Sequence, residues 1–201
     1  MNHLSHYHFA QSLLDNGLYC LGLIYPDIEP EWRTTEGIPA EIVRGAEEHA
    51  IIDDAFHNLG WFVAAKDSLK EDSKPYNVEV LVHRALEIGI DLQLHPRIAG
   101  TGLIERVKLL LSADEVTGFL GVFRKGRETV MAISQGGRLE SYGTFEGGVE
   151  ALQRSHVDLF GYAYRTTAIT ELYQRATDAA NGFFGATQEE LLGKIKGTSE
   201  Q

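Results

Sequence analysis

Hydrophobic positions along the chain recur mainly at helical spacing. Such spacing covers Leu4–Leu14, Ala40–Leu59, Leu103–Leu111 and Glu150–Ala180, and each segment is predicted to form a helix. The pair Asn16-Gly17 is expected to end the first helix, because this pair commonly stops a helix or makes a turn. The pattern therefore predicts a mainly all-α fold, a helical bundle forming a single domain over residues 1–201.

Two stretches interrupt the helical pattern. Residues 18–39 contain Pro26, Pro30 and Pro39, so a long irregular connection carrying Asp27 is predicted there. Residues 118–142 have glycines scattered among apolar residues, and neither helices nor strands are predicted for them.

The segment Val80–Pro96 supports two readings. Its apolar residues from Leu86 to Leu94 alternate with other residues at every second position, which indicates a half-buried strand. Helical spacing would instead place His83, Glu87, Asp91 and His95 on one slowly drifting ridge. In either conformation Glu87 and Asp91 share a face, so two carboxylates are expected to project together.

Composition narrows the class of protein. Apolar residues make up 43% and charged residues 23%, which is ordinary for a globular chain. No apolar run approaches the roughly 18 residues of a membrane-spanning helix, and three histidines occupy the first ten residues, where a signal peptide would be apolar. A cytoplasmic location is therefore expected. The single cysteine, Cys20, stands in an apolar run and is expected to pack as a small hydrophobic residue.

The net charge limits the possible partners, and the distribution of histidines suggests a functional site. The formal net charge is −11 and no Lys/Arg cluster is present, which disfavours nucleic acid and anionic membranes as partners. Six of the eight histidines lie within the first 83 residues, in the company of Asp and Glu. This distribution favours a function that uses imidazole and carboxylate together.

His49, Asp53 and His57 give the strongest local signal, because spacings of four residues place them within about 80° of arc on a helix. The apolar residues of the same stripe are Ile42, Ala46, Ile52 and Phe56. Burying an unpaired carboxylate costs several kcal/mol, so Asp53 is expected to be neutralised, most simply by a divalent metal. The alternative is a hydrogen-bonded His–Asp pair in the core.

The opening of the chain adds further candidate ligands. His6 and His8 are two residues apart, about 200° on a helix, and cannot both face one metal from a regular helix. Together with Asp27 and the 83–95 segment, these residues predict a metal site built mostly from residues 2–95. Mixed imidazole and carboxylate ligands suit Mn, Fe, Zn or Mg. Such an ion would acidify a water molecule and neutralise phosphate oxygens, as phosphoester hydrolysis requires.

The same residues resemble the acyl carrier protein phosphodiesterase family. The matching positions are Asn2, Leu4, His6, His8 and Ala10 at the start, Gly22 with Asp27, the block Gly45, His49, Asp53 and Asn58, and the acids Glu87 and Asp91. The resemblance covers residues 2–95. It departs at Glu47, where the family has a histidine, and at His57, where the family often has an acid. No adjacent His-Asp pair of the HD type is present.

The resemblance implies a helical fold related to HD-type phosphohydrolases, manganese as the favoured ion, and acyl carrier protein as a possible partner. Because such carriers are acidic, a chain of net charge −11 would meet them slowly. The resulting hypothesis is a metal-dependent phosphodiesterase. Its expected metal ligands are His6, His8, Asp27, His49, Asp53 and Asp91, and its expected catalytic residues are Asp27, His57 and Glu87.

Two alternatives belong to other classes. One is a helical metal-binding or interaction protein without catalytic activity, for which the changes at Glu47 and His57 provide a reason. The other is a carboxylate-bridged di-iron oxidoreductase, although the Glu-x-x-His pairs that such proteins carry on bundle helices are not evident.

Overall fold

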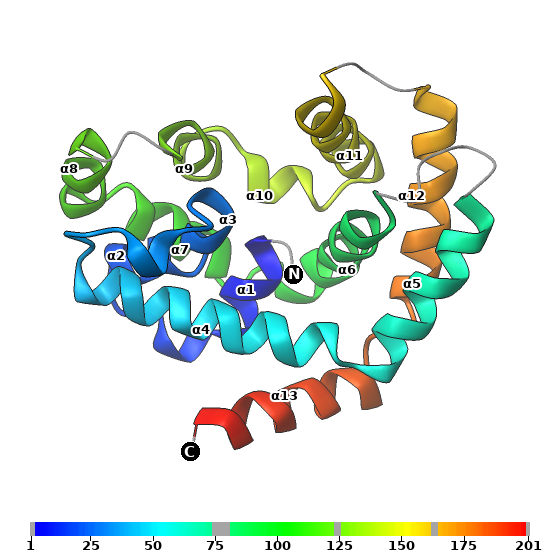
Figure 1. The fold of residues 1–201 in the computed structure, drawn as a ribbon, viewed down its shortest axis with the longest axis horizontal. Helices are drawn as coiled ribbons and strands as arrows, with labels where there is room; N and C mark the ends of the chain where they lie inside the picture. Colours follow the sequence, from blue (N-terminus) through cyan, green and yellow to red (C-terminus); the bar gives the residue numbers. More distant parts are fainter. Residues whose placement is uncertain (1–2, 74–80, 123–125, 162–164, 200–201) are drawn as a thin grey trace. The chain divides into compact units, whose positions relative to one another are not determined.

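A computed structural model shows that the protein is all-α over the residues it describes, which are 3–73, 81–122, 126–161 and 165–199. No strand occurs in these ranges, so the predicted helical class is confirmed (Figure 1). The chain divides into two compact units. Unit 1 comprises Met1–Asn2, Ala55–Arg97 and Ser141–Gln201, and unit 2 comprises His3–Asp54 and Ile98–Glu140.

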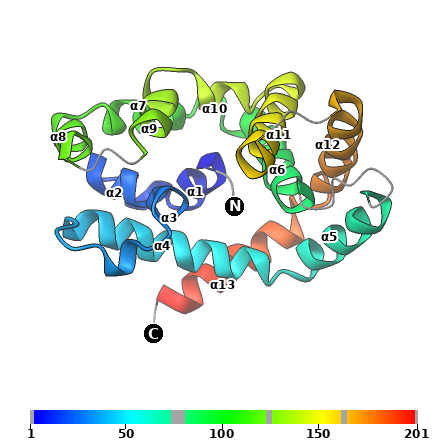
Figure 2. The ribbon, with the colours of Figure 1, turned by 45° about the horizontal axis from the view of Figure 1, so that its top comes forward.

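Unit 2 is built from several short helices and most of one long helix. They are α1 (His3–Phe9), α2 (Gly17–Gly22), α3 (Tyr25–Ile28), most of α4 (Ala40–His57), α7 (Leu103–Leu111), α8 (Asp114–Val122), α9 (Arg127–Ser134) and most of α10 (Arg138–Ser141), with 3₁₀ turns η1 (Gln11–Leu13) and η2 (Trp32–Thr34). Figure 2 shows α1 to α3 between α4 and the helices α7 to α9. Fully buried Leu4, Tyr7 and Leu21 belong to this middle layer.

Unit 1 is built from longer helices. They are the last turn of α4, α5 (Gly60–Ser73), α6 (Val82–Ile98, whose last residue belongs to unit 2), α11 (Phe145–Phe160), α12 (Thr166–Ala180) and α13 (Ala186–Ser199). An aromatic cluster lies in its core, where the ring centroid of Phe56 is 4.5 Å from that of Phe62 and 5.9 Å from that of Phe183. Helix α6 approaches α12 closely, since a Cβ on Gly89 would lie 3.1 Å from the Ala176 carbonyl oxygen.

Two helix boundaries differ from the prediction, and a capping residue explains each of them. Asn16 begins a helix instead of ending one: its side chain accepts a 2.7 Å hydrogen bond from the Tyr19 amide at the start of α2. The predicted irregular connection over residues 18–39 therefore contains α2 and α3. The predicted helix Glu150–Ala180 is two helices, because Gly161 ends α11 with φ 75°, a left-handed conformation that glycine adopts without strain. Tyr162 and Tyr164, expected near its buried side, lie outside the described residues.

The strand indicated by the alternation within residues 80–96 is wrong, because this segment is helix α6. Residues 85–91 are all buried, so the helix meets the protein interior around its whole circumference. A helix buried on every side loses the 3.6-residue amphipathic period that would identify it. By contrast Leu103–Leu111 matches α7, and α4 ends two residues before the predicted Leu59. Residues 118–142, left without an assignment, contain α9, α10 and the last part of α8.

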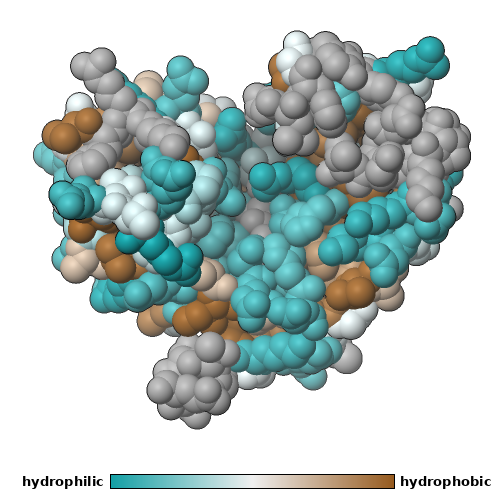
Figure 3. Space-filling view, viewed as in Figure 1, coloured by the Kyte–Doolittle hydropathy of each residue, from teal (hydrophilic) through white to brown (hydrophobic). Residues whose placement is uncertain are grey.

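On the face shown in Figure 3, the described surface is mainly hydrophilic, as expected for a chain of ordinary globular composition. Apolar residues are scattered among the hydrophilic ones. Cys20 is fully buried, and burial raises the pKa of its thiol far above the usual value, which agrees with a packing role. None of the described helices has the length and apolar composition needed to cross a membrane.

Candidate functional site

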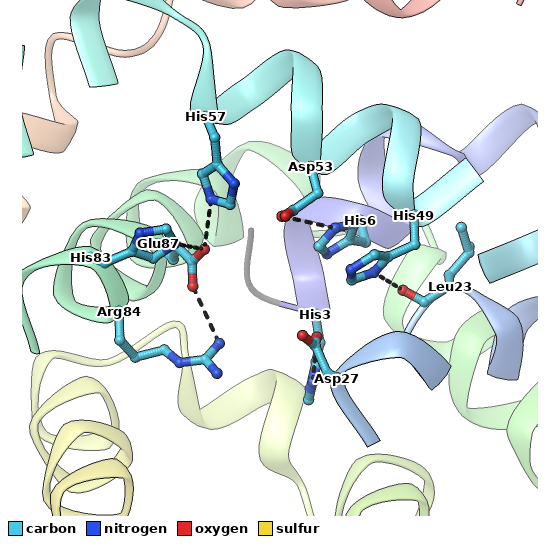
Figure 4. Close-up of polar contacts among 10 residues, drawn as sticks. All are labelled: His3, His6, Leu23, Asp27, His49, Asp53, His57, His83, Arg84 and Glu87. Carbon is cyan, nitrogen blue, oxygen red and sulfur yellow. Dashed lines mark hydrogen bonds and ion pairs between the residues drawn. The ribbon is translucent and has the colours of Figure 1, made fainter. Parts of the chain in front are cut away.

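His6, His49 and Asp53 converge within unit 2. Their nitrogen and oxygen ligand atoms all lie within 4.8 Å of one another, and His6 Nε2 lies 3.9 Å from Asp53 Oδ1 (Figure 4). His6 comes from α1, whereas His49 and Asp53 stand one helical turn apart on α4. His6 and His49 are buried, and the Asp53 side chain keeps 30% of its surface exposed. The group therefore consists of two buried imidazoles and a partly exposed carboxylate.

A contact between two glycines positions this group. A Cβ on Gly45 would overlap the Tyr19 carbonyl oxygen and would lie 2.9 Å from the Gly22 Cα, so α2 and α4 meet backbone to backbone. Leu23 follows Gly22 directly, and His49 stands one turn after Gly45. The contact thus brings the Leu23 carbonyl oxygen to 2.9 Å from His49 Nδ1.

This hydrogen bond orients the His49 ring. A carbonyl oxygen can only accept, so His49 Nδ1 carries the proton and donates it to Leu23. The lone pair of the neutral ring is then on Nε2. A backbone carbonyl that holds the far nitrogen in this way is a common partner of metal-binding histidines. The His6 ring lies nearly parallel to that of His49, with centroids 4.1 Å apart and an interplanar angle of 8°.

The other ligands predicted for this half of the chain lie outside the group. His8 is on the same regular helix as His6 but does not join it, as the two-residue spacing requires. Burial lowers the pKa of His8. Asp27 lies in α3 with its Oδ2 atom 3.7 Å from His3 Nε2. Asp27 thus pairs with a histidine that the sequence did not single out, although His3 and His6 are three residues apart on one helical face.

A second group lies in unit 1. His83 and Glu87 are four residues apart on α6, and His57 is the last residue of α4. Glu87 Oε1 lies 2.9 Å from His83 Nε2 and 3.3 Å from His57 Nε2, and Arg84 Nη1 donates a 3.2 Å hydrogen bond to Oε2 (Figure 4). His57 and Glu87, predicted as catalytic residues, are therefore placed together, and their catalytic role stays a prediction.

The Glu87 carboxyl is buried, yet its pKa is lowered. Burial alone would raise the pKa of its carboxyl, but surrounding positive and hydrogen-bonding groups, among them His57, His83 and Arg84, hold the pKa well below the usual value. Since the pKa is lower in the folded state, ionised Glu87 stabilises the fold above the unfolded-state pKa of 4.5. This stabilisation is lost as the pH falls through the folded-state pKa.

Replacement of Glu87 by Gln tests this linkage in metal-free protein. The variant is expected to be less stable than the native chain at about pH 5.5, and the difference should shrink as the pH falls further. Urea unfolding curves between pH 3 and pH 7 measure it. A difference in unfolding free energy that stays constant down to pH 3 would show that Glu87 carries no such linkage.

Asp91, the remaining predicted ligand, is fully buried in α6 and belongs to neither group among the described residues. Burial raises the pKa of Tyr173 in the same unit, and the charge of Asp91 raises it further. The Tyr173 hydroxyl donates a 3.5 Å hydrogen bond to the Ile88 carbonyl. The structure thus places Asp91 among buried polar groups of unit 1, and its role as a ligand stays a prediction.

Both groups fit a transition metal by the chemistry of their donors. Two imidazole nitrogens and one carboxylate oxygen are the set found in catalytic zinc sites and in the facial triads of non-haem iron.

The Leu23 carbonyl was not predicted from the sequence, because every residue has a backbone carbonyl and no pattern singles this one out. The four-residue spacing of His83 and Glu87 was a usable signal for the second group.

Comparison of the chain with known protein families, with curated proteins and with solved structures finds no match.

Proposed function

We propose that the protein is a metal-dependent phosphoesterase that cleaves phosphodiesters, with a divalent cation held by His6, His49 and Asp53. The observation that carries this proposal is the meeting of these three side chains, with the His49 ring turned by the Leu23 carbonyl so that Nε2 presents a lone pair. Manganese is the favoured ion, and iron, zinc and magnesium suit the same donors.

A divalent ion at this position would supply an acidified water and neutralise charge on the phosphate oxygens. The protein's own residues have separate tasks. His6 and His49 bind through neutral nitrogens, whereas Asp53 contributes the one negative charge of the set. Because Asp53 keeps part of its surface exposed, a substrate has access to the side of the group that this carboxylate borders.

His3 and Asp27 would handle the protons of the reaction. His3 Nε2 lies 3.7 Å from Asp27 Oδ2, and 30% of the Asp27 side chain is exposed. A carboxylate beside an imidazole favours its protonated form, and such a pair can give a proton to a leaving alkoxide. His3 shares the face of α1 with His6, so the pair is expected to act next to the bound ion.

The substrate class is a small phosphodiester. Acyl carrier protein is a possible partner on the resemblance alone, and a chain of net charge −11 would repel an acidic carrier. Among the possible phosphate-binding cations, the Arg44 guanidinium already binds both Asp15 carboxylate oxygens at 2.9 Å. The positive charge for a phosphate is therefore expected to come chiefly from the bound ion.

Removal and return of metal tests the proposal. The purified protein is expected to hydrolyse bis(4-nitrophenyl) phosphate, to lose this activity on treatment with a chelator, and to regain it with Mn²⁺. Release of 4-nitrophenol and elemental analysis are the measurements. Bound metal without turnover of any phosphodiester would favour the non-catalytic alternative. An iron chromophore that reacts with dioxygen would favour the oxidoreductase.

A further inference from the structure

The group formed by His57, His83 and Glu87 has the geometry of a metal site. Ligands about 2.0–2.2 Å from one tetrahedral ion lie about 3.3–3.6 Å from each other. Glu87 Oε1 lies 2.9 Å and 3.3 Å from the two imidazole Nε2 atoms, and all three ligand atoms lie within 4.8 Å of one another. An ion could therefore replace the proton that each imidazole shares with the carboxylate after only small movements of the side chains.

The second carboxylate oxygen of Glu87 is already engaged. Arg84, one residue after His83, donates from Nη1 to Oε2 at 3.2 Å. Oε1 is the carboxylate oxygen that faces the two imidazoles. Carboxylate ligands of metals are commonly held by such an outer hydrogen bond.

The surroundings suit entry of an ion from solvent. The His57 and His83 side chains keep 28% and 42% of their surface exposed, whereas Glu87 keeps 4%. The Phe62 ring centroid lies 5.2 Å from the centroid of each imidazole and limits how far the rings can turn. The buried carboxylate thus lies beneath two partly exposed imidazoles whose Nε2 atoms face it.

We propose that His57, His83 and Glu87 form a second site for a divalent ion of the zinc class, with a coordination position left for water or a small ligand. None of these three residues belongs to the His6–His49–Asp53 group, and the proposal does not rest on the proposed phosphoesterase function. The two exposed imidazoles and the single carboxylate favour Zn²⁺, or Co²⁺ as its spectroscopic substitute, over Mg²⁺ or Ca²⁺.

Titration of metal-free protein with Co²⁺, followed by visible absorption and calorimetry, tests this site. The full native chain is expected to bind two ions, one for each group. Replacement of His83 by Gln should weaken binding of one of them by about 100-fold or more, because a direct ligand is lost. His95 is a matched control, since it lies on the same helix outside both groups, and His95→Gln should still bind two ions.

The Asp53→Asn variant separates the two proposals. It should lose the Co²⁺ ion bound by His6, His49 and Asp53. It should retain the Co²⁺ ion bound by His57, His83 and Glu87. Binding of two ions by the native chain and by the His83→Gln variant with unchanged affinities would overturn the second site. Binding of a single ion that Asp53→Asn abolishes would also overturn it, and would leave the phosphoesterase proposal standing. Thermal unfolding checks that each variant is folded.

Discussion

Replacement of Asp53 by Asn is expected to remove metal from the His6–His49–Asp53 group and to lower phosphodiesterase kcat/KM by about 1,000-fold or more. The amide keeps the size of the side chain but removes the only negative charge among the three ligands. A bound ion contributes several kcal/mol of transition-state stabilisation in hydrolysis, and about 4 kcal/mol corresponds to this factor. Elemental analysis and steady-state kinetics with excess Mn²⁺ measure the effect.

Asp54 provides the control for this substitution. It is the next residue of α4, carries the same charge and is exposed, and it belongs to neither group of ligands. Asp54→Asn changes the net charge by the same amount and should retain both metal and activity. Equal losses in the two variants would attribute the effect to overall charge, and full activity in Asp53→Asn would rule out the assigned centre.

Replacement of Gly45 by Ala is expected to destabilise the protein by about 2–3 kcal/mol and to lower its Tm by about 5–10 °C. The added Cβ would overlap the Tyr19 carbonyl oxygen and press on Gly22, and backbone cannot move aside as a flexible side chain can. Separation of α2 from α4 would also draw the Leu23 carbonyl away from His49. Metal affinity at the first group should therefore fall by about 10- to 100-fold.

Gly118 is the matched control, because a Cβ there has no neighbour within 4 Å and the residue lies within helix α8. Gly118→Ala should leave metal binding unchanged and raise stability by about 0.5–1 kcal/mol, since alanine favours helix over glycine. Thermal unfolding and Mn²⁺ titration measure both variants. A Gly45→Ala variant as stable as the native chain would mean that the two helices are not in contact.

Sequence spacing predicted part of the His6–His49–Asp53 group. On α4 the four-residue step from His49 to Asp53 placed both on one face, and the predicted stripe of Ile42, Ile52 and Phe56 is fully buried. The choice between His6 and His8 was open from the sequence. A regular helix decided it, because only one of two residues about 200° apart can face α4.

The second group shows where spacing failed. The alternation from Leu86 to Leu94 indicated a strand, and α6 is a helix in which burial of all residues from 85 to 91 hides the helical period. Within that helix His83 reaches Glu87 one turn away, which only the helical reading predicts. Arg84, three residues before Glu87, donates a hydrogen bond to the other oxygen of the same carboxylate.

The sequence by itself determined the all-α class, the helices α4 and α7, and the presence of His and carboxylate at ligand spacing on α4, because these depend on neighbours within a few turns. Only the tertiary structure decided which residues meet. His6 joins His49 through the backbone contact of Gly22 and Gly45, and the Leu23 carbonyl selects the free nitrogen of the ring. These side chains meet through contacts between segments that are distant in the chain. Such contacts cannot be predicted from the local spacing of residues.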